Sequence, residues 1–178
     1  MQELFFSLYY FQRMVKYFEH LSSSAAETKR LGYFLAIKIA GKKKRKALVF
    51  GLKGDLGGGK TTFLQGFAKG LRIKQKILSP TFLILKKFKI ESGGLKVESG
   101  KKTTYYIPHS TFYHLDCYRI KKPREILDLG FKKIISDSEN IIAIEWADRI
   151  KKIIPKNANW IKFEFIDKNK RKIKISKF

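Results

Sequence analysis

The sequence predicts a single α/β domain with a mixed central sheet, flanking helices and an antiparallel C-terminal hairpin. Three observations lead to this prediction. Helical patterns alternate with short apolar segments through most of the chain, as in proteins whose helices cover a partly parallel sheet. The last two alternating segments are separated only by a short polar turn. The length of 178 residues suits one domain, and no segment repeats another.

The first half of this domain is expected to alternate strand and helix. The first element is a strand from Met14. A helix follows it, because Ser24 and Glu27 have the spacing of a capping box, which marks a helix start. The continuous apolar run "ALVFGL" is typical of a buried parallel strand. A helix from about Lys60 to Leu71 follows it.

The second half is expected to contain five strands and one helix. "SPTFLILKKFKI" is a loop that runs into a strand, and "HSTFYHLDCYRI" is another strand. Between them, about residues 89–110 are polar and contain glycine, so we expect an extended hairpin arm. Pro123 begins a helix through about Ile135, and "NIIAIEWADRI" is a buried strand ending in Glu145. "NWIKFEFID" and "KIKIS" form the final hairpin around "KNKR".

The formal net charge of +24 favours polyanionic partners, such as nucleic acid or an anionic membrane. The lysines are nevertheless scattered along the chain and are not confined to one tail. A lysine-rich, solvated surface explains the same composition equally well, so charge alone does not establish a nucleic-acid contact.

Cysteine content and hydropathy indicate a cytoplasmic protein. Cys117 is the only cysteine and cannot form an intrachain disulfide, which fits a reducing compartment. No run approaches the ~20 apolar residues of a membrane span, so we expect no stable membrane association. The start, "MQELFFSLYYFQRM", is a poor secretory signal because Glu3 replaces a basic region. We interpret residues 1–13 as a loosely ordered extension, or as lying outside a true start at Met14; a weak interfacial anchor is the alternative. The domain is then residues 14–178.

The segment from Gly54 to Thr61, "GDLGGGKT", matches the phosphate-binding pattern G-x-x-x-x-G-K-[ST], the P-loop. Glycines let successive backbone N–H groups converge on phosphate oxygens, and the following helix adds its positive dipole end. Lys60 would reach the β- and γ-phosphates, and the Thr61 hydroxyl would ligate Mg²⁺. The alternative is a glycine-rich turn that fits by chance. The apolar strand before it and the helix after it favour nucleoside triphosphate binding.

Two carboxylates are candidates for the chemistry beside such a loop. Glu145 ends an apolar strand, where it would hold Mg²⁺ or its water; the alternative is a surface residue at a strand exit. Asp116 interrupts an apolar strand and would orient the attacking water or bind metal; the alternative is an ion pair with Arg119. We expect a structural role for His114. Nothing has zinc-ligand spacing.

Guanine-specific P-loop proteins usually carry N-K-x-D. The only "NK" here is Asn169-Lys170, followed by Arg171-Lys172, which weakens a GTPase interpretation.

Taken together, these motifs resemble the TsaE family of P-loop ATPases in tRNA threonylcarbamoyladenosine biosynthesis. The resemblance is carried in order by "GDLGGGKTT", "SPTF" at Ser79–Phe82, "YHLDCYR" at Tyr113–Arg119, "LG" at 129–130 and "IEW" at 144–146. "ETKRLG" at 27–32 and "KRKIKI" near the end extend it from about Met14 to Ile175. The P-loop alone is generic, whereas the ordered set is specific.

The resemblance implies ATP and Mg²⁺ binding and a weak ATPase activity in isolation. It also implies partners of the TsaD and TsaB types, which install the threonylcarbamoyl group on tRNA. Contact of this chain with tRNA would be indirect, or weak through a basic surface. The hairpin arm looks longer than is usual in the family and would alter partner contacts or add basic surface.

Residue roles are also implied by the resemblance. Lys60, Asp116 and Glu145 would be the catalytic residues, with Asp116 near the γ-phosphate. Thr61 and Glu145 would hold Mg²⁺, while Trp146 would support Glu145 and the "SPTF" segment would act as a nucleotide-sensing switch. The implied nucleotide-binding set is Thr28, Leu56, Gly57, Gly58, Gly59, Lys60, Thr61, Thr62, Asp116 and Arg171.

Two alternatives remain open. A small-molecule P-loop kinase would need an acceptor pocket and commonly an arginine-bearing lid over the phosphates. An RNA-binding module with incidental ATP binding would bind RNA tightly, with strong salt dependence and without ATP.

Overall fold

The structure is a computed structural model that describes residues 17–39, 45–78, 84–99, 101–107 and 109–176. The first thirteen residues, the predicted start at Met14 and the "SPTF" segment lie outside these ranges, so those predictions stay as they are. Within the described ranges, no helix is both long and apolar enough to cross a membrane.

Seven strands form one mixed sheet in the order β1-β9-β8-β2-β7-β6-β3. Their bounds are β1 Tyr17–Ser22, β2 Leu48–Gly54, β3 Leu85–Ile90, β6 Ser110–Asp116, β7 Asn140–Glu145, β8 Asn159–Phe165 and β9 Arg171–Ser176. The central strands β8, β2, β7 and β6 are parallel neighbours, while β1, β9 and β3 pair antiparallel. The predicted fold class is confirmed, including the antiparallel C-terminal hairpin of β8 and β9.

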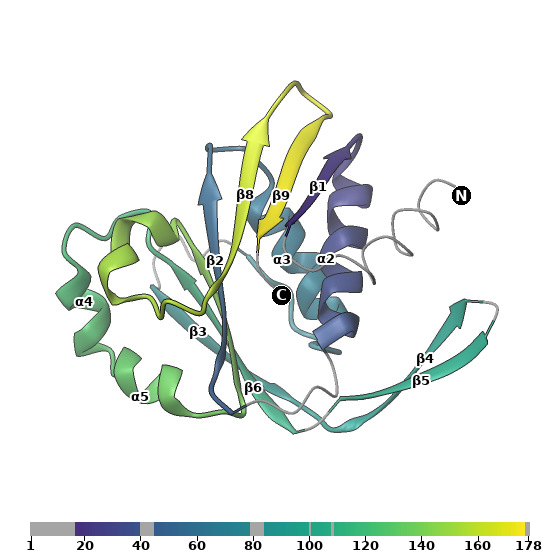
Figure 1. Ribbon diagram of the computed structural model, residues 1–178, viewed down its shortest axis with the longest axis horizontal. Helices are drawn as coiled ribbons and strands as arrows, with labels where there is room; N and C mark the ends of the chain where they lie inside the picture. The colour runs from purple at the N-terminus through teal and green to yellow at the C-terminus, as the bar shows by residue number, and fades with distance from the viewer. Residues whose placement is uncertain (1–16, 40–44, 79–83, 100, 108, 177–178) are drawn as a thin grey trace.

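Helices cover the two faces of this sheet (Figure 1). Helices α2 (Ala25–Ile39) and α3 (Lys60–Gly70) pack on one face and against each other. Helices α4 (Pro123–Asp128) and α5 (Phe131–Ser136) and the 3₁₀ segment η1 (Ala147–Ile153) contribute to the apolar cluster on the other face. The β2 side chains alternate between these layers, with Phe50 and Leu52 in the first and Val49 in the second.

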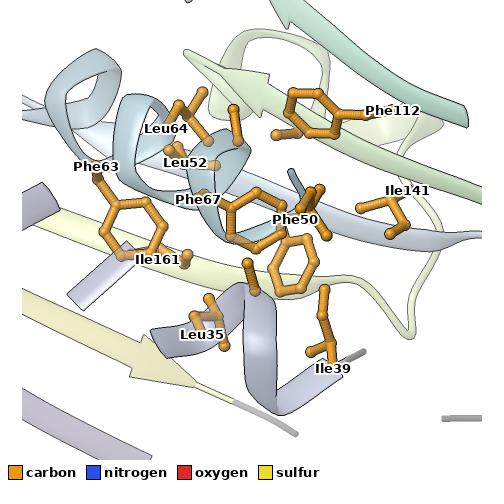
Figure 2. Close-up of a cluster of buried hydrophobic side chains, with 14 of the residues drawn as sticks. Leu35, Ile39, Phe50, Leu52, Phe63, Leu64, Phe67, Phe112, Ile141 and Ile161 are labelled. Atoms are coloured by element: carbon orange, nitrogen blue, oxygen red, sulfur yellow. The ribbon is translucent and has the colours of Figure 1, made fainter. Parts of the chain in front are cut away.

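Aromatic packing fixes α3 against the sheet (Figure 2). The rings of Phe50 on β2 and Phe67 on α3 meet edge to face, with centroids 5.3 Å apart, and Phe112 on β6 lies beside them. Each of these three side chains is at most 1% exposed. Buried aromatic pairs of this kind add about 0.5–1.5 kcal/mol beyond their buried area. The packing fixes the orientation of α3 on the sheet, and α3 and β2 are the two elements that the glycine loop joins.

The prediction of one helix from Pro123 through Ile135 is wrong. It is divided into α4 and α5 at Gly130, whose φ of 78° lies in the left-handed region. A residue in this conformation ends one helix and lets the chain begin the next.

The start of α2 follows the predicted capping box with one change. The backbone N–H of Glu27 donates to Ser24 Oγ at 3.1 Å, as expected. The carboxylate of Glu27 accepts from the backbone N–H of Ser23 at 2.7 Å, one residue before the expected donor.

A separate two-stranded antiparallel sheet consists of β4 (Gly93–Ser99) and β5 (Lys101–Ile107). It lies in the segment for which we expected a hairpin arm, and it extends away from the central sheet (Figure 1).

Candidate functional site

The glycine loop joins the end of β2 to the start of α3 at the carboxyl edge of the parallel strands. Gly54, Gly57 and Gly59 have φ values of 125°, 70° and 96°, which side-chain-bearing residues rarely adopt. A Cβ on Gly54 would lie 1.9 Å from the backbone oxygen of Phe163 on β8. The glycines are therefore required by backbone conformation and by close approach of a neighbouring strand.

The first turn of α3 presents backbone donors toward the loop. Gly59 is the N-cap residue and has no side chain to cap the helix. The first N–H groups of an α-helix lack intrahelical acceptors, and the helix dipole makes this end positive. The local geometry therefore suits an anion such as a phosphate group.

A pocket opens over this loop and collects most of the predicted site residues. Its lining consists of Ala25, Thr28, Leu56, Gly57, Gly58, Gly59, Lys60, Thr61, Thr62, Glu145, Trp146, Lys168, Asn169 and Arg171. Of the residues predicted to be catalytic, metal-binding or nucleotide-binding, all of which the structure describes, only Asp116 is not in this lining.

Thr61 and Glu145 meet at the floor of the pocket. The Thr61 hydroxyl lies 3.0 and 2.8 Å from the two carboxylate oxygens of Glu145. Glu145 ends β7, pairs with Leu52 on β2, and is only 2% exposed. A hydroxyl and a carboxylate are the hard oxygen donors that Mg²⁺ prefers, and Mg²⁺ sites commonly combine one or two protein ligands with substrate phosphates. The donor set therefore fits Mg²⁺.

His114 supports this carboxylate from the neighbouring strand. Its Nε2 lies 2.9 Å from Glu145 Oε1, and its ring is fully buried. Its Nδ1 is the one buried side-chain polar atom without a hydrogen-bond partner within the described residues. In the tautomer that suits this geometry, Nε2–H donates to the carboxylate. The structural role expected for His114 is thus specific: it holds Glu145. Its position two residues before Asp116, on the same face of one strand, was the available signal.

Lys60 is held within the loop that carries it. Its Nζ donates to the backbone oxygens of Gly54 and Asp55 at 2.8 and 2.7 Å, and lies 3.8 Å from the centroid of a Trp146 ring. Burial lowers the pKa of Lys60 below its usual value, while nearby carboxylates, Glu145 foremost, oppose that shift. The ammonium is desolvated and partnered at the pocket wall.

The structure places Trp146 against Lys60, a contact that the expected support of Glu145 did not include. It lines the pocket, contacts Lys60 and, although not a glycine, has a φ of 57°. Such a backbone costs of order 1–3 kcal/mol and is concentrated at functional sites. The sequence pattern "EW" gave no indication of this conformation.

Thr28 and Arg171 approach the loop from opposite ends of the chain. A Cβ on Gly59 would lie 3.6 Å from Thr28 Cγ2 and 3.7 Å from Arg171 Cγ. Thr28 is fixed by a 2.8 Å hydrogen bond to Ser22, and Arg171 Nε donates to the Gly57 oxygen at 2.8 Å. The turn before Arg171 also brings Lys168 and Asn169 to the pocket, which the sequence analysis missed.

Asp116 lies at the same edge of the sheet but beside the pocket. It ends β6, opposite Glu145 in the β6–β7 register, and its Oδ1 accepts from the N–H of Tyr118 at 2.9 Å. Its predicted place near the γ-phosphate stays a prediction.

The family model described as "Threonylcarbamoyl adenosine biosynthesis protein TsaE" matches residues 22–173. The chain belongs to the TsaE family. The matched range contains every predicted site residue of this chain, from Thr28 to Arg171.

Known members and a solved structure agree with this assignment. A TsaE protein of Rickettsia conorii is 35% identical over 153 residues, which are 85% of this chain and 74% of the relative. A TsaE protein of Rickettsia typhi is 33% identical over 159 residues, covering 89% of this chain and 94% of the relative. Both are named tRNA threonylcarbamoyladenosine biosynthesis proteins. The crystal structure of Bacillus subtilis YdiB superposes with a TM-score of 0.65 at 26% identity, covering 92% of this chain and 87% of YdiB.

Proposed function

We propose that this TsaE-family chain is an Mg²⁺-dependent ATPase of tRNA threonylcarbamoyladenosine modification, acting with TsaD- and TsaB-type partner proteins. The observation that carries the proposal is the Thr61–Glu145 pair beside Lys60 and the glycine loop. Membership of the family, whose known members are named for this tRNA modification, supports the biological role.

The residues of the pocket have different roles in binding and hydrolysis. Backbone N–H groups of residues 56–62 bind phosphate oxygens, and Lys60 leaves its two loop carbonyls to neutralise the β- and γ-phosphates. Thr61 and Glu145, which are hydrogen-bonded to each other, would hold Mg²⁺. Bound Mg²⁺ supplies positive charge that stabilises the transferring phosphoryl group. Asp116, at the same sheet edge as Glu145, orients the attacking water.

Thr28 and Arg171 flank Gly59 and contact the nucleotide beyond its phosphates. Because the chain lacks the N-K-x-D guanine reader, ATP is the preferred nucleotide.

The first test is ATP binding by the full chain, measured by titration calorimetry with and without Mg²⁺. Lys60→Ala removes charge-assisted contacts to phosphate, so its affinity should fall about 10- to 100-fold. Lys69→Ala is the matched control, because Lys69 lies exposed at the far end of the same helix. Equal ATP affinity in Lys60→Ala and the parent would contradict the proposal.

Phosphate release separates the alternatives. An ATPase releases phosphate from ATP and Mg²⁺ without an acceptor, whereas a small-molecule kinase requires one. A module with incidental ATP binding would bind ATP without turnover.

The decisive experiment for the pathway is reconstitution. Threonylcarbamoylation of tRNA by the partner proteins should continue over many cycles only when this chain and ATP are present. Equal yields with and without the chain would overturn the proposed role.

A further inference from the structure

One half of the central sheet carries a charged face on the side opposite α2 and α3. Along β8 and β9, side chains facing α2 and α3 are fully buried, including Ile161, Phe163 and Ile173. Their alternating neighbours point to the other side and remain at least partly exposed; these are Trp160, Lys162, Glu164, Lys172, Lys174 and Ser176. Helices α4 and α5 lie beside the β7–β6–β3 half of the sheet (Figure 1).

Three lysines share one register across this face, and we call them the lysine row: Lys53, Lys162 and Lys174. Lys53 on β2 pairs with Lys162 on β8, which pairs with Lys174 on β9. Adjacent strands lie about 4.8 Å apart, and like charges directly opposite each other destabilise a sheet. The register continues to Glu19 on β1, so the positive charge of this row favours a polyanion to the extent that neighbouring carboxylates do not offset it.

Carboxylates offset this charge only in part. Glu164 Oε1 lies 2.7 Å from Lys162 Nζ and 3.7 Å from Lys174 Nζ. Glu19 on β1 is shared between Lys172 at 3.5 Å and Lys174 at 3.4 Å. Among the ion pairs of the described residues, two acids thus serve Lys162, Lys172 and Lys174, and surface pairs of this kind have little strength. Lys53 and Lys151 add further positive charge beside them, and Asp148 adds one negative charge.

An indole lies in the middle of these charges. Trp160 is half-buried beside Gly51, where an added Cβ would lie 3.0 Å from the ring, so Gly51 leaves room for the indole on the sheet. Lys53 Nζ lies 5.8 Å from the Trp160 ring centroid. The two side chains border a surface hollow together with Asp148, Lys151, Lys162, Lys174 and Ser176. Lysines that hold phosphates around an aromatic ring that stacks a base are the basis of single-stranded nucleic-acid binding.

We propose that this surface binds RNA, with the lysine row on phosphates and one unpaired base against Trp160. Its identification with tRNA rests on the proposed function. The site lies on the β8–β9 sheet face and shares no residue with the pocket lining of the nucleotide site. It therefore allows the chain to hold RNA and nucleotide at the same time.

The test is binding of an unmodified tRNA transcript to the full chain, measured by fluorescence anisotropy at about 50 to 200 mM salt. The surface variant is Lys53→Gln/Lys162→Gln/Lys174→Gln. The control variant, Lys69→Gln/Lys132→Gln/Lys133→Gln, removes the same charge from exposed positions elsewhere. Each lost phosphate contact reduces the magnitude of the negative slope of log affinity against log salt by roughly 0.7–0.9. The slope of the surface variant should therefore be smaller in magnitude by about 2–3. Its affinity at low salt should fall at least about tenfold, and the control should change far less.

Trp160 is tested by Trp160→Phe, which keeps an aromatic face, and Trp160→Leu, which does not. We expect Trp160→Leu to weaken binding at least about fivefold with an unchanged salt slope, and Trp160→Phe to retain most of the affinity. Thermal unfolding of each variant verifies that it is folded.

Three outcomes would overturn the proposal. The parent chain could fail to bind tRNA, or both triple variants could lose affinity equally, which is the result for a diffuse lysine-rich surface. The surface variant could also keep tRNA affinity but fail to join the partner proteins, which would make this face a protein interface. ATP hydrolysis by the surface variant should equal that of the parent. If the parent hydrolyses no ATP, the ATPase proposal fails, but the result on RNA binding remains valid.

Discussion

At the scale of single residues, the proposed Mg²⁺ dependence rests on Glu145. Glu145→Gln preserves size but removes the charge that would face Mg²⁺, while Lys60 and the loop amides remain. ATP affinity without Mg²⁺ should change less than about threefold, whereas Mg²⁺-dependent hydrolysis should fall at least about 100-fold. Phosphate release across an Mg²⁺ titration measures this. Hydrolysis at the parental rate would show that Glu145 is not the second carboxylate.

His114 should act on Mg²⁺ through Glu145. Its Nε2 holds Glu145 Oε1 at 2.9 Å, and loss of such a supporting partner typically costs 10- to 100-fold in metal affinity. His114→Phe should therefore raise the Mg²⁺ concentration for half-maximal hydrolysis by about 10- to 100-fold, and His114→Gln, which keeps an N–H donor, should restore part of it. ATP affinity without Mg²⁺ should stay the same in both. An unshifted Mg²⁺ titration in a folded His114→Phe protein would refute this.

The residues that the sequence could place at the site are those whose chemistry defines a motif. Lys60, Thr61 and Glu145 were predicted to meet, and they line one pocket. The contact of Trp146 with Lys60 and the place of Lys168 could not be predicted, because they depend on a left-handed backbone and on a turn brought in from the C-terminal hairpin.

At the scale of elements, two glycines set the distance between α2 and α3. A Cβ on Gly66 would lie 1.8 Å from the backbone oxygen of Lys29, and one on Gly32 would lie 2.1 Å from that of Phe63. The helices therefore touch through their backbones. Since α3 begins with Lys60, this contact also positions the phosphate loop.

Gly66→Ala should destabilise the protein although alanine favours helices by about 1 kcal/mol over glycine. Forcing the helices apart should cost about 2–3 kcal/mol and lower Tm by roughly 4–12 °C. Thermal unfolding measures the loss, with Lys69→Ala on the exposed side of α3 as control. A stability equal to or above the parent would show that α2 and α3 can separate freely.

The elements themselves were largely predictable, because periodicity and turn residues are local signals. The alternating pattern from Asn159 gave the final hairpin, and Ser24 with Glu27 gave the start of α2. The division of α4 from α5 was not predicted. Pro123 was interpreted as the start of one helix, and Gly130 within the helical pattern was not interpreted as its end.

At the scale of the whole molecule, the strand order is what local signals cannot supply. The order β1-β9-β8-β2-β7-β6-β3 places Arg171 on Gly57, although 114 residues separate them. The same order aligns Lys53, Lys162 and Lys174 in one register. Long-range pairing thus completes the candidate pocket around the glycine loop and aligns lysines that are scattered along the sequence into the lysine row.

The net charge of +24 should itself limit stability, because like charges repel more in the compact state than in the unfolded chain. Screening acts over about 10 Å at 0.1 M salt and about 3 Å at 1 M, so added sodium chloride should relieve the repulsion. Between about 20 and 500 mM, Tm should rise by roughly 2–8 °C, equivalent to about 1–2 kcal/mol. A Tm that stays level or falls would mean that the charges are already balanced locally.

Phosphate at matched ionic strength separates this general screening from occupation of the glycine loop. Screening depends on ionic strength alone, whereas an anion bound at the start of α3 stabilises the folded state by mass action. Phosphate should therefore raise Tm beyond chloride in the parent, and Lys60→Ala should lose that excess while keeping the chloride effect. An equal excess in both proteins would place phosphate elsewhere on the basic surface.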